Sequence, residues 1–243
     1  MTKMKYAIIS DIHSNLEALR RVLEEIDKLG VDRIICLGDI VGYGANPNEC
    51  VEIIRERKIE SIMGNHDIVE CGGKEPFDFN PVARDAVLWT RAALTAENRE
   101  FLHNLPEMRE MHDFLIVHGA ISDSDLYVFS VYDAFSEFKL MKKWNICFFG
   151  HTHVRAYYIF LGGDVCCLSD YEFKIEPEAK YLINPGSVGQ PRDRDPRSSF
   201  LIYDSGEAIV SFIRQEYDIE SAKKKIIKSG LDRRLADRLY LGI

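Results

Sequence analysis

The sequence predicts an α/β protein that begins with a parallel sheet and continues into antiparallel strands. Within the first sixty residues, short apolar runs alternate with helical periodicity in the order β-α-β-α-β, which is typical of parallel strands joined by crossover helices. After residue 153, short apolar runs are joined by tight turns, which favours antiparallel pairing. Because the 243 residues contain no linker, repeat or low-complexity tract, we expect a single domain over residues 1–243.

The first elements follow from local signals. Strands are expected at 6–10, 33–37 and 59–63. The run Ser14-Asn15-Leu16-Glu17 has the pattern of a capping box, so it predicts the start of a helix that ends at Gly30. Asn46-Pro47 opens the second helix, because proline is favoured at the first helical position.

The later elements are shorter. Helices are expected at 81–94, 95–104 and 133–143, and strands at 114–117 and 146–149. Antiparallel strands are expected at 154–161, 165–169, 181–183, 199–204 and 208–213. The chain therefore has a helical segment at about 80–105, and its tail at about 219–241 is expected to form two short helices around Gly230.

Composition excludes several classes of protein. With 46% hydrophobic and 29% charged residues the chain is of ordinary globular type, and 31 basic against 39 acidic residues disfavour a nucleic acid duplex as the primary partner. No apolar stretch approaches the ~20 residues that a membrane helix needs. The six cysteines form no Cys-x-x-Cys motif, and Cys36 and Cys147 lie in apolar runs. We therefore expect a cytoplasmic protein in a reducing compartment.

Polar side chains follow five of the predicted strands. They are Asp11 and His13, then Asp39, then Asn65, His66 and Asp67, then His118, and finally His151 and His153. A lone histidine after a strand is most often an ordinary loop residue. Here, however, five of the seven histidines of the chain occupy such positions. Because the carboxyl ends of parallel strands meet at one edge of a sheet, these side chains are expected to form a shared metal site.

The residue types indicate which metals this site would bind. Carboxylate, amide oxygen and imidazole together suit borderline divalent ions, of which Mn²⁺ is our first expectation, with Fe, Ni, Co or Zn as alternatives. The lack of thiolates disfavours a structural zinc site. The ligands are too many for one ion, so we expect two ions about 3.5–4 Å apart that share a carboxylate and hold a bridging hydroxide for attack on a phosphoryl group.

These segments, in this order, resemble the five sequence blocks of the calcineurin-like metallophosphoesterases. The run 184–192 also resembles the later part of the small bacterial and archaeal members. The resemblance implies a four-layer α/β/β/α sandwich of two mixed sheets flanked by helices. It also implies that one metal takes Asp11, His13 and His153, that the other takes Asn65, His118 and His151, and that Asp39 bridges them. His66 would then contact the substrate phosphate and assist the leaving group.

One block departs from a branch of this family. The serine/threonine protein phosphatases extend the second block to Gly-Asp-x-x-Asp-Arg-Gly, whereas this chain has Gly-Asp-Ile-Val-Gly-Tyr-Gly at 38–44. The departure argues against a protein phosphatase and leaves open which residue orients His66. Arg192 and Arg194 are candidates for a phosphate clamp, with pairing to Asp193 and Asp195 as the alternative. Tyr43 is a further candidate for substrate contact.

The function expected from these residues is that of a metal-dependent phosphoester hydrolase. Its substrate is expected to be a small, nucleotide-like phosphodiester, phosphomonoester or phosphoanhydride, and no membrane partner is expected. A dinucleoside tetraphosphate hydrolase is the nearest specific alternative by resemblance. A non-catalytic interaction scaffold is the alternative of another class, because a eukaryotic retromer subunit resembles this fold but lacks several ligands. Here every ligand position is filled, and His66, which a scaffold would not need, is also present.

Overall fold

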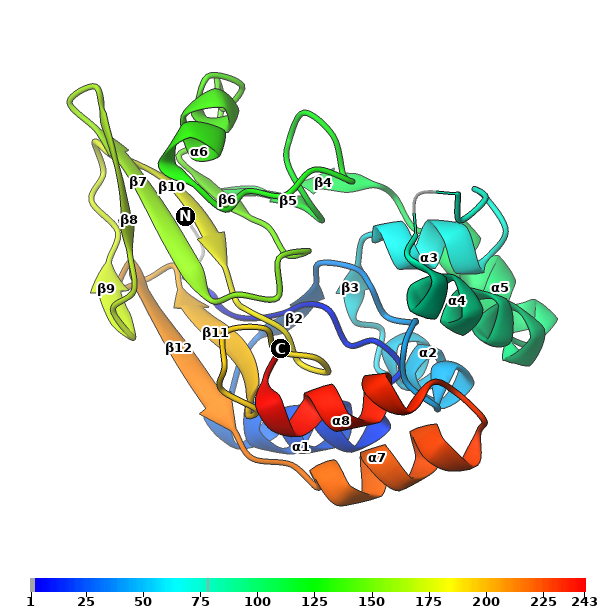
Figure 1. Ribbon diagram of the computed structural model, residues 1–243. Helices are drawn as coiled ribbons and strands as arrows, with labels where there is room; N and C mark the ends of the chain where they lie inside the picture. The colour runs from blue at the N-terminus through cyan, green and yellow to red at the C-terminus, as the bar shows by residue number, and fades with distance from the viewer. Residues whose placement is uncertain (1–2, 78) are drawn as a thin grey trace.

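Two six-stranded mixed sheets pack face to face in the computed structural model, which describes residues 3–77 and 79–243 (Figure 1). Helices cover the outer face of each sheet, with α1 (Leu16–Leu29) on one side and α6 (Val131–Phe138) on the other. This arrangement confirms the four-layer α/β/β/α sandwich that the family resemblance implied.

The first sheet joins the parallel N-terminal strands to an antiparallel C-terminal hairpin. Its order is β3 (Glu60–Ser61), β2 (Arg33–Cys36), β1 (Lys5–Ile9), β11 (Ser198–Asp204), β12 (Ile209–Gln215) and β9 (Glu172–Lys174). At the centre, Ile8 of β1 is opposite Ile35 in a parallel pair and opposite Leu201 in an antiparallel pair. The predicted β-α-β-α-β start is therefore present, although its third strand has only two residues.

The second sheet contains the middle of the chain. Its order is β4 (Met108–Glu110), β5 (Leu115–Val117), β6 (Ile146–Phe148), β10 (Lys180–Asn184), β7 (Ala156–Leu161) and β8 (Asp164–Leu168). The expectation that all strands after residue 153 pair antiparallel is wrong at one place. β10 is antiparallel to β7 but parallel to β6, because the chain returns to the sheet centre after the β7–β8 hairpin.

Most helices lie where the sequence places them. The remaining ones are α2 (Pro47–Glu56), α3 (Asn65–Glu70), α4 (Pro81–Ala93), α5 (Ala96–His103), α7 (Ile219–Lys228) and α8 (Arg233–Leu241). Asn15 caps α1 by accepting from the backbone N–H of Ala18 at 3.2 Å, whereas the hydroxyl of Ser14 has no partner among the described residues. The capping-box pattern therefore predicted the helix correctly but not through Ser14.

Three apolar layers hold the sandwich together. Because neighbouring residues of a strand point to opposite faces, Ala7 and Ile9 contact the cluster under α1 and α2, and Ile8 lies in the cluster between the sheets. The layer between the sheets is rich in aromatic rings, including Phe114 and Tyr203. These closely packed layers hold the strand ends in place, so the polar loops that follow the strands are held in place as well.

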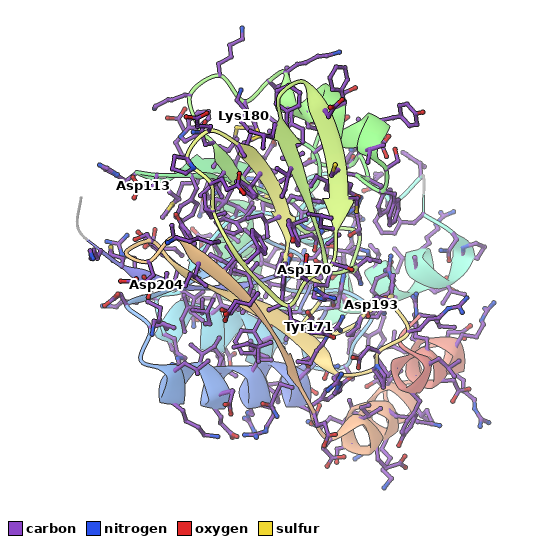
Figure 2. All side chains as sticks on the ribbon, turned by 90° about the vertical axis from the view of Figure 1, so that its left-hand side faces the viewer. Asp113, Asp170, Tyr171, Lys180, Asp193 and Asp204 are labelled. Carbon is purple, nitrogen blue, oxygen red and sulfur yellow. The ribbon has the colours of Figure 1, made fainter. Side chains whose placement is uncertain are left out.

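The C-terminal helices lie beside the strand ends of the first sheet. α7 and α8 pack against each other and against α4 through an apolar cluster that Tyr43 and Trp89 border. Figure 2 shows Asp193 on the side of the sandwich nearer these helices, with Lys180 and Asp204 farther away. The loop at 192–194 contacts the end of α8, where the Arg194 N–H donates to the Gly242 carbonyl at 2.8 Å. No helix in the described part of the chain combines the length and apolarity that crossing a bilayer requires.

Candidate metal centre

The predicted strand-end residues come together on one edge of the sandwich, in loops with an uncommon backbone. Asp11, His13, Asp39, His151 and His153 all have φ between +49° and +65°, a region that side chains other than glycine rarely adopt. Hydrogen bonds between loops support this geometry, since the Asp11 N–H donates to the Gly38 carbonyl and the His13 N–H to the Asp39 carbonyl. Such strain concentrates at functional sites.

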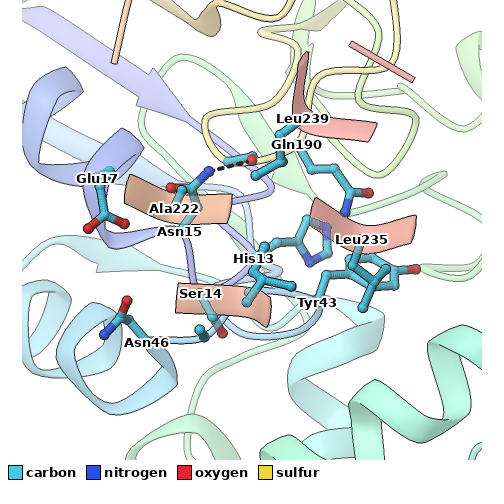
Figure 3. A pocket seen from close by; sticks show the side chains of 14 residues that line it. His13, Ser14, Asn15, Glu17, Tyr43, Asn46, Gln190, Ala222, Leu235 and Leu239 are labelled. Atoms are coloured by element: carbon cyan, nitrogen blue, oxygen red, sulfur yellow. Dashed lines mark hydrogen bonds between the residues drawn. The ribbon is translucent and has the colours of Figure 1, made fainter. Parts of the chain in front are cut away.

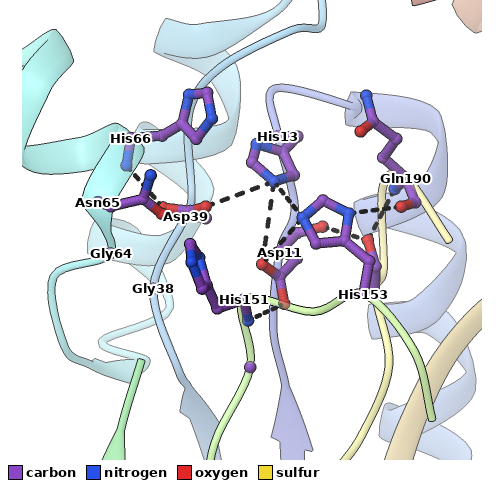
Figure 4. A network of polar contacts seen from close by, with 12 residues as sticks. Asp11, His13, Gly38, Asp39, Gly64, Asn65, His66, His151, His153 and Gln190 are labelled. Atoms are coloured by element: carbon purple, nitrogen blue, oxygen red, sulfur yellow. Dashed lines mark hydrogen bonds and ion pairs between the residues drawn. The ribbon is translucent and has the colours of Figure 1, made fainter. Parts of the chain in front are cut away.

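One group of ligand atoms comes from Asp11, His13, Asp39 and His153, all buried and all within 4.8 Å of one another. The Nδ1 atoms of His13 and His153 lie 3.0 and 2.6 Å from the carbonyls of Val41 and Gln190, so Nδ1 carries the proton in both rings. Their Nε2 atoms, each with a lone pair, lie 3.0 Å apart (Figure 4). Two facing lone pairs need a cation between them, which is what a metal ion supplies.

A second group comes from Asp39, His118 and His151. His118 has Nδ1 2.8 Å from the Leu37 carbonyl, and its Nε2 lies 3.1 Å from Oδ1 of Asn65. His151 instead has Nε2 3.2 Å from the Asp125 carbonyl, which leaves Nδ1 as its free ligand atom. The amide oxygen and both imidazoles are therefore directed toward the space beside Asp39. Burial lowers the pKa of His118, but the charge of Asp39 outweighs it and raises the pKa to about 10, so a metal bound here would displace the proton on Nε2.

Asp39 is the residue that the two groups share. Its Oδ2 lies 3.5 Å from Nε2 of His13 and 3.3 Å from Nε2 of His118, while its Oδ1 accepts from the His66 N–H at 2.9 Å. Gly64 makes this close approach possible, because a Cβ there would lie 2.2 Å from Oδ1 of Asp39. One carboxylate oxygen is thus directed toward both groups, as a bridging ligand requires.

Burial and mutual charge shift the pKa values of these groups strongly. Burial lowers the pKa of His151 to about 3 and holds those of His13 and His153 well below the usual value, so these rings are neutral, as metal ligands must be. Burial also raises the pKa of Asp11 to about 7. For Asp39 burial acts in the same upward direction, but the adjacent histidines, His118 foremost, hold its pKa well below the usual range.

The donor set fits divalent ions at both groups. Carboxylate, amide oxygen and neutral imidazole are the ligands that borderline divalent metals take. Oδ1 of Asp11 is buried, lies 3.3 Å from Nε2 of His153, and has no hydrogen-bond partner in the described part of the chain. A buried carboxylate oxygen without a donor is costly unless a cation occupies the space beside it. The arrangement is consistent with a dinuclear metal site.

His66 lies beside this centre and has a partner that the sequence did not reveal. Nδ1 of His66 is 3.2 Å from Oε1 of Glu70, one helical turn further along α3, and both side chains are buried. Burial lowers the pKa of His66 to about 4 and raises that of Glu70 well above its usual value. Glu70 follows His66 at the i+4 spacing of a helix, a signal visible only once Asn65–Glu70 is known to be helical.

Asp67, the neighbour of His66 in sequence, has a different role. Its Oδ1 accepts from the N–H groups of Ile40 and Val41 at 2.9 and 3.1 Å, and its Oδ2 accepts from the Gly64 N–H at 3.0 Å. These three bonds join the loop after β2 to the start of α3. Asp67 thus fixes the loops that carry Asp39 and Asn65 and does not contact the His66 ring.

Tyr43 and Arg192 border the same centre. The Tyr43 ring lies 4.4 Å from the His66 ring and 4.8 Å from the His13 ring, between the metal centre and α8 (Figure 3). Arg192 lies over Tyr43, at 5.9 Å from its ring centre. Arg194 is exposed, with φ +66°. The structure adds Arg238 of α8 at 6.0 Å from the same ring, a residue that no sequence motif indicated.

A cavity of about 280 Å³ opens beside His66. Aromatic side chains and residues of α3 and α4 line it, together with polar and charged side chains, among them Lys74, Glu75, Asp125 and His151. Of its three aromatic residues, Phe79 contacts His66 edge to face, and Tyr127 stacks on His151 with the ring centres 4.0 Å apart. The cavity therefore offers flat apolar surfaces next to the candidate metal ligands.

Comparison with known proteins matches this chain and its fold to one family. The model of the calcineurin-like phosphoesterase superfamily domain matches residues 4–207. An uncharacterized protein of Methanocaldococcus jannaschii, MJ0912, is 41% identical, with all of both chains covered. The crystal structure of a metallophosphoesterase from Sphaerobacter thermophilus is 38% identical, with 99% of each chain covered and a TM-score of 0.86. The hypothetical protein PH1004 from Pyrococcus horikoshii shares the fold, at 20% identity, 98% coverage of each chain and a TM-score of 0.83.

Proposed function

Since the chain belongs to the calcineurin-like phosphoesterase superfamily, we propose that it is a dinuclear-metal phosphoesterase that hydrolyses small, nucleotide-like phosphoesters. One observation carries this proposal. Oδ2 of Asp39 lies within 3.5 Å of a histidine Nε2 from each of two buried ligand groups, so one carboxylate serves both. A scaffold of the same fold has no need for this arrangement.

The ligand assignment follows from which atoms are free. We assign Asp11, His13 and His153 to one ion, Asn65, His118 and His151 to the other, and Asp39 to both. Each histidine has its second ring nitrogen against a backbone carbonyl, which orients the ring and sets its tautomer. Mn²⁺ is the ion we propose first, because it accepts this mixture of oxygen and nitrogen ligands.

The reaction rests on the ions and on two side chains of this chain. Two divalent ions held by these ligands would supply an activated water molecule and would neutralise charge on the phosphoryl group. His66 is the proposed catalytic residue. With Glu70 neutral and donating to Nδ1 of His66, the ring hydrogen sits on Nε2. As this hydrogen passes to the departing oxygen, the proton of Glu70 moves to Nδ1, so that the ring stays neutral and Glu70 becomes a carboxylate. Arg192 is proposed to contact phosphate oxygens, since its guanidinium forms no ion pair within the described residues.

The cavity supports a small substrate with a flat group. At about 280 Å³ it is near the lower end of ordinary ligand pockets, and Tyr43, Phe79 and Tyr127 offer rings on which a base or an aryl group can stack. All six cysteines are unpaired, which suits a reducing compartment, and we place the protein in the cytoplasm.

The test is the hydrolysis of bis(p-nitrophenyl) phosphate by metal-free protein to which Mn²⁺ is added. We expect turnover that depends on Mn²⁺ and stops when a chelator is added. His151→Ala should abolish it, whereas His112→Ala, which removes an exposed histidine that pairs with Asp113 and belongs to neither ligand group, should not. Binding of Mn²⁺ without turnover of this ester or of a library of nucleotides would favour the non-catalytic scaffold.

A further inference from the structure

Two arginines beside the candidate metal centre pair with no acidic side chain among the described residues. Arg192 and Arg238 face the Tyr43 ring at 5.9 and 6.0 Å, and neither forms an ion pair with a carboxylate side chain in the described part of the chain. Arg192 donates to the amide oxygen of Gln190, and Nε of Arg238 donates at 2.5 Å to a terminal oxygen of Ile243, the last residue of the structure. Most of their N–H groups are left free, and a guanidinium group with free N–H groups is well suited to bind a phosphate.

The nearby carboxylates are already paired with other cations. Asp193 pairs with Arg214, Asp195 with Arg197 and Arg214, and Asp237 with Lys223 and Arg233. The alternative in which Arg192 is a loop charge neutralised by Asp193 or Asp195 therefore does not describe this structure. Arg192 therefore has no carboxylate partner in the described part of the chain, and Arg238 has only the terminal oxygen of Ile243, so both keep N–H groups that can bind a further anion.

The two charges also act on each other. Burial, followed by the charge of Arg192, lowers the pKa of Arg238 to about 10. Half-buried like charges are unfavourable, and an anion placed between them removes both the repulsion and part of the desolvation cost. The C-terminal helix α8 holds Arg238 in place through Leu235 and Leu239, which pack into the apolar cluster with α4 and α7.

The arginine pair adjoins the metal centre by way of a groove. A hollow of about 460 Å³ is lined by Tyr43, Asn80 and Arg238, among others. It shares Tyr43, Asn80 and Ala83 with the cavity at His66, so the two spaces meet at Tyr43. A molecule whose phosphoryl group lies at the metal centre can therefore extend over Tyr43 toward Arg238.

We propose that Arg192 and Arg238 form a subsite for a second phosphoryl group of the substrate, so that the enzyme selects nucleoside diphosphates and related phosphoanhydrides over substrates with a single phosphate. This rests on the proposed function, because the first phosphoryl group is the one held at the metal centre. The family model ends at residue 207, and α8 lies beyond it. Arg238 is therefore a specificity residue from outside the matched family domain.

The test compares AMP with ADP, which differ by one phosphoryl group. Each nucleotide is titrated by calorimetry into Mn²⁺-loaded protein at the same free Mn²⁺ concentration. We expect wild-type protein to bind ADP at least about tenfold more tightly than AMP, the scale of one charge-assisted contact. Arg238→Met should reduce the preference to about twofold or less. Arg233→Met, on the exposed face of the same helix, should leave the preference unchanged.

Two further measurements keep the outcome clear. Arg192→Gln tests the other arginine of the pair and is expected to weaken the preference as Arg238→Met does. It gives an independent result if Arg238→Met fails to fold. Hydrolysis of bis(p-nitrophenyl) phosphate by the same wild-type preparation reports on the proposed function separately. Turnover of this ester with equal affinity for AMP and ADP, or with a preference that survives both substitutions, would overturn the subsite alone. A preference that needs Arg238, without turnover, would support the subsite and overturn the hydrolase.

Discussion

At the scale of single residues, the site is defined by which atoms are left without partners. His13 and His153 each have one ring nitrogen against a carbonyl and the other facing its counterpart at 3.0 Å. The sequence predicted the residue types at these positions, because each follows an apolar strand. It did not predict Glu70 or Arg238, since their roles depend on the turn of α3 and on how α8 packs against the site.

The proposed role of His66 predicts that the loss of kcat on its removal depends on the leaving group. His66→Ala should lower kcat by about 10²–10⁴-fold on an ester with a basic leaving group, because general acid assistance has that size. On an aryl ester, whose leaving group needs little protonation, the loss should be much smaller. A series of aryl and alkyl esters measures this, with metal content as the control. Equal damage across the series would show that His66 stabilises phosphate charge and does not act as an acid.

Glu70 is proposed to be a positioning residue that acts through His66. Glu70→Ala should lower kcat by roughly tenfold without changing metal content, because it removes the group 3.2 Å from Nδ1 of His66. The loss in Glu70→Ala should grow with the basicity of the leaving group, as for His66→Ala. Glu70→Gln keeps a hydrogen-bonding group of the same length but has no proton to pass to Nδ1, so it should recover the rate on aryl esters and not on esters with basic leaving groups. Full rescue by Gln on every ester, or a loss that does not depend on the leaving group, would contradict this role.

At the scale of elements, local sequence signals predicted where helices and strands begin better than they predicted which contacts hold these starting points in place. Pro47 and Asn80-Pro81 start helices where expected, because the proline ring favours the first turn whatever the tertiary contacts are. The helix α3 was not predicted, since six residues at a strand end give too short a pattern to detect. The shift of the α1 cap from Ser14 to Asn15 also has a tertiary cause. Nδ2 of Asn15 donates to the Gly189 carbonyl at 2.8 Å and fixes that side chain over the helix start.

This difference in capping is measurable as stability. Asn15→Ala should lower the free energy of unfolding by about 2 kcal/mol, because it removes both the cap and the bond to Gly189. Ser14→Ala should change it by less than about 0.5 kcal/mol, since the Ser14 hydroxyl has no partner among the described residues. Urea unfolding of the chelated proteins compares the two. A larger loss of stability for Ser14→Ala than for Asn15→Ala would support Ser14 as the helix cap, as the sequence pattern suggested.

At the scale of the whole molecule, two rigid sheets bring seven side chains from distant parts of the sequence to one edge. The order of strands in the second sheet, where β10 lies between β6 and β7, could not be predicted, because the sequence pattern does not distinguish the neighbours of a short buried strand. The convergence of the strand ends within each sheet could be predicted, because it follows from parallel pairing. How the ligands of the first sheet meet His118, His151 and His153 of the second depends on the packing of the two sheets, which the sequence pattern does not show.

Metal binding should stabilise the entire fold. At a Mn²⁺ concentration one hundred times the dissociation constant, linkage gives about 2.7 kcal/mol, which corresponds to a rise in Tm of roughly 5–10 °C for a chain of this size. Calorimetric melting with and without Mn²⁺ measures the shift. His153→Ala should reduce it, because one proposed ligand is lost, while His112→Ala should preserve it. Identical melting curves for wild-type protein with and without Mn²⁺ would argue against a metal site.

The most direct test is a stepwise titration of metal-free protein with Mn²⁺, in which bound metal and turnover of bis(p-nitrophenyl) phosphate are measured on the same samples. With Asp39 as the shared ligand, turnover should reach its plateau at two ions per chain, and Asp39→Ala should lose metal from both positions and lose turnover with it. A plateau at one ion, or two ions fully retained in Asp39→Ala, would contradict a dinuclear centre bridged by this residue.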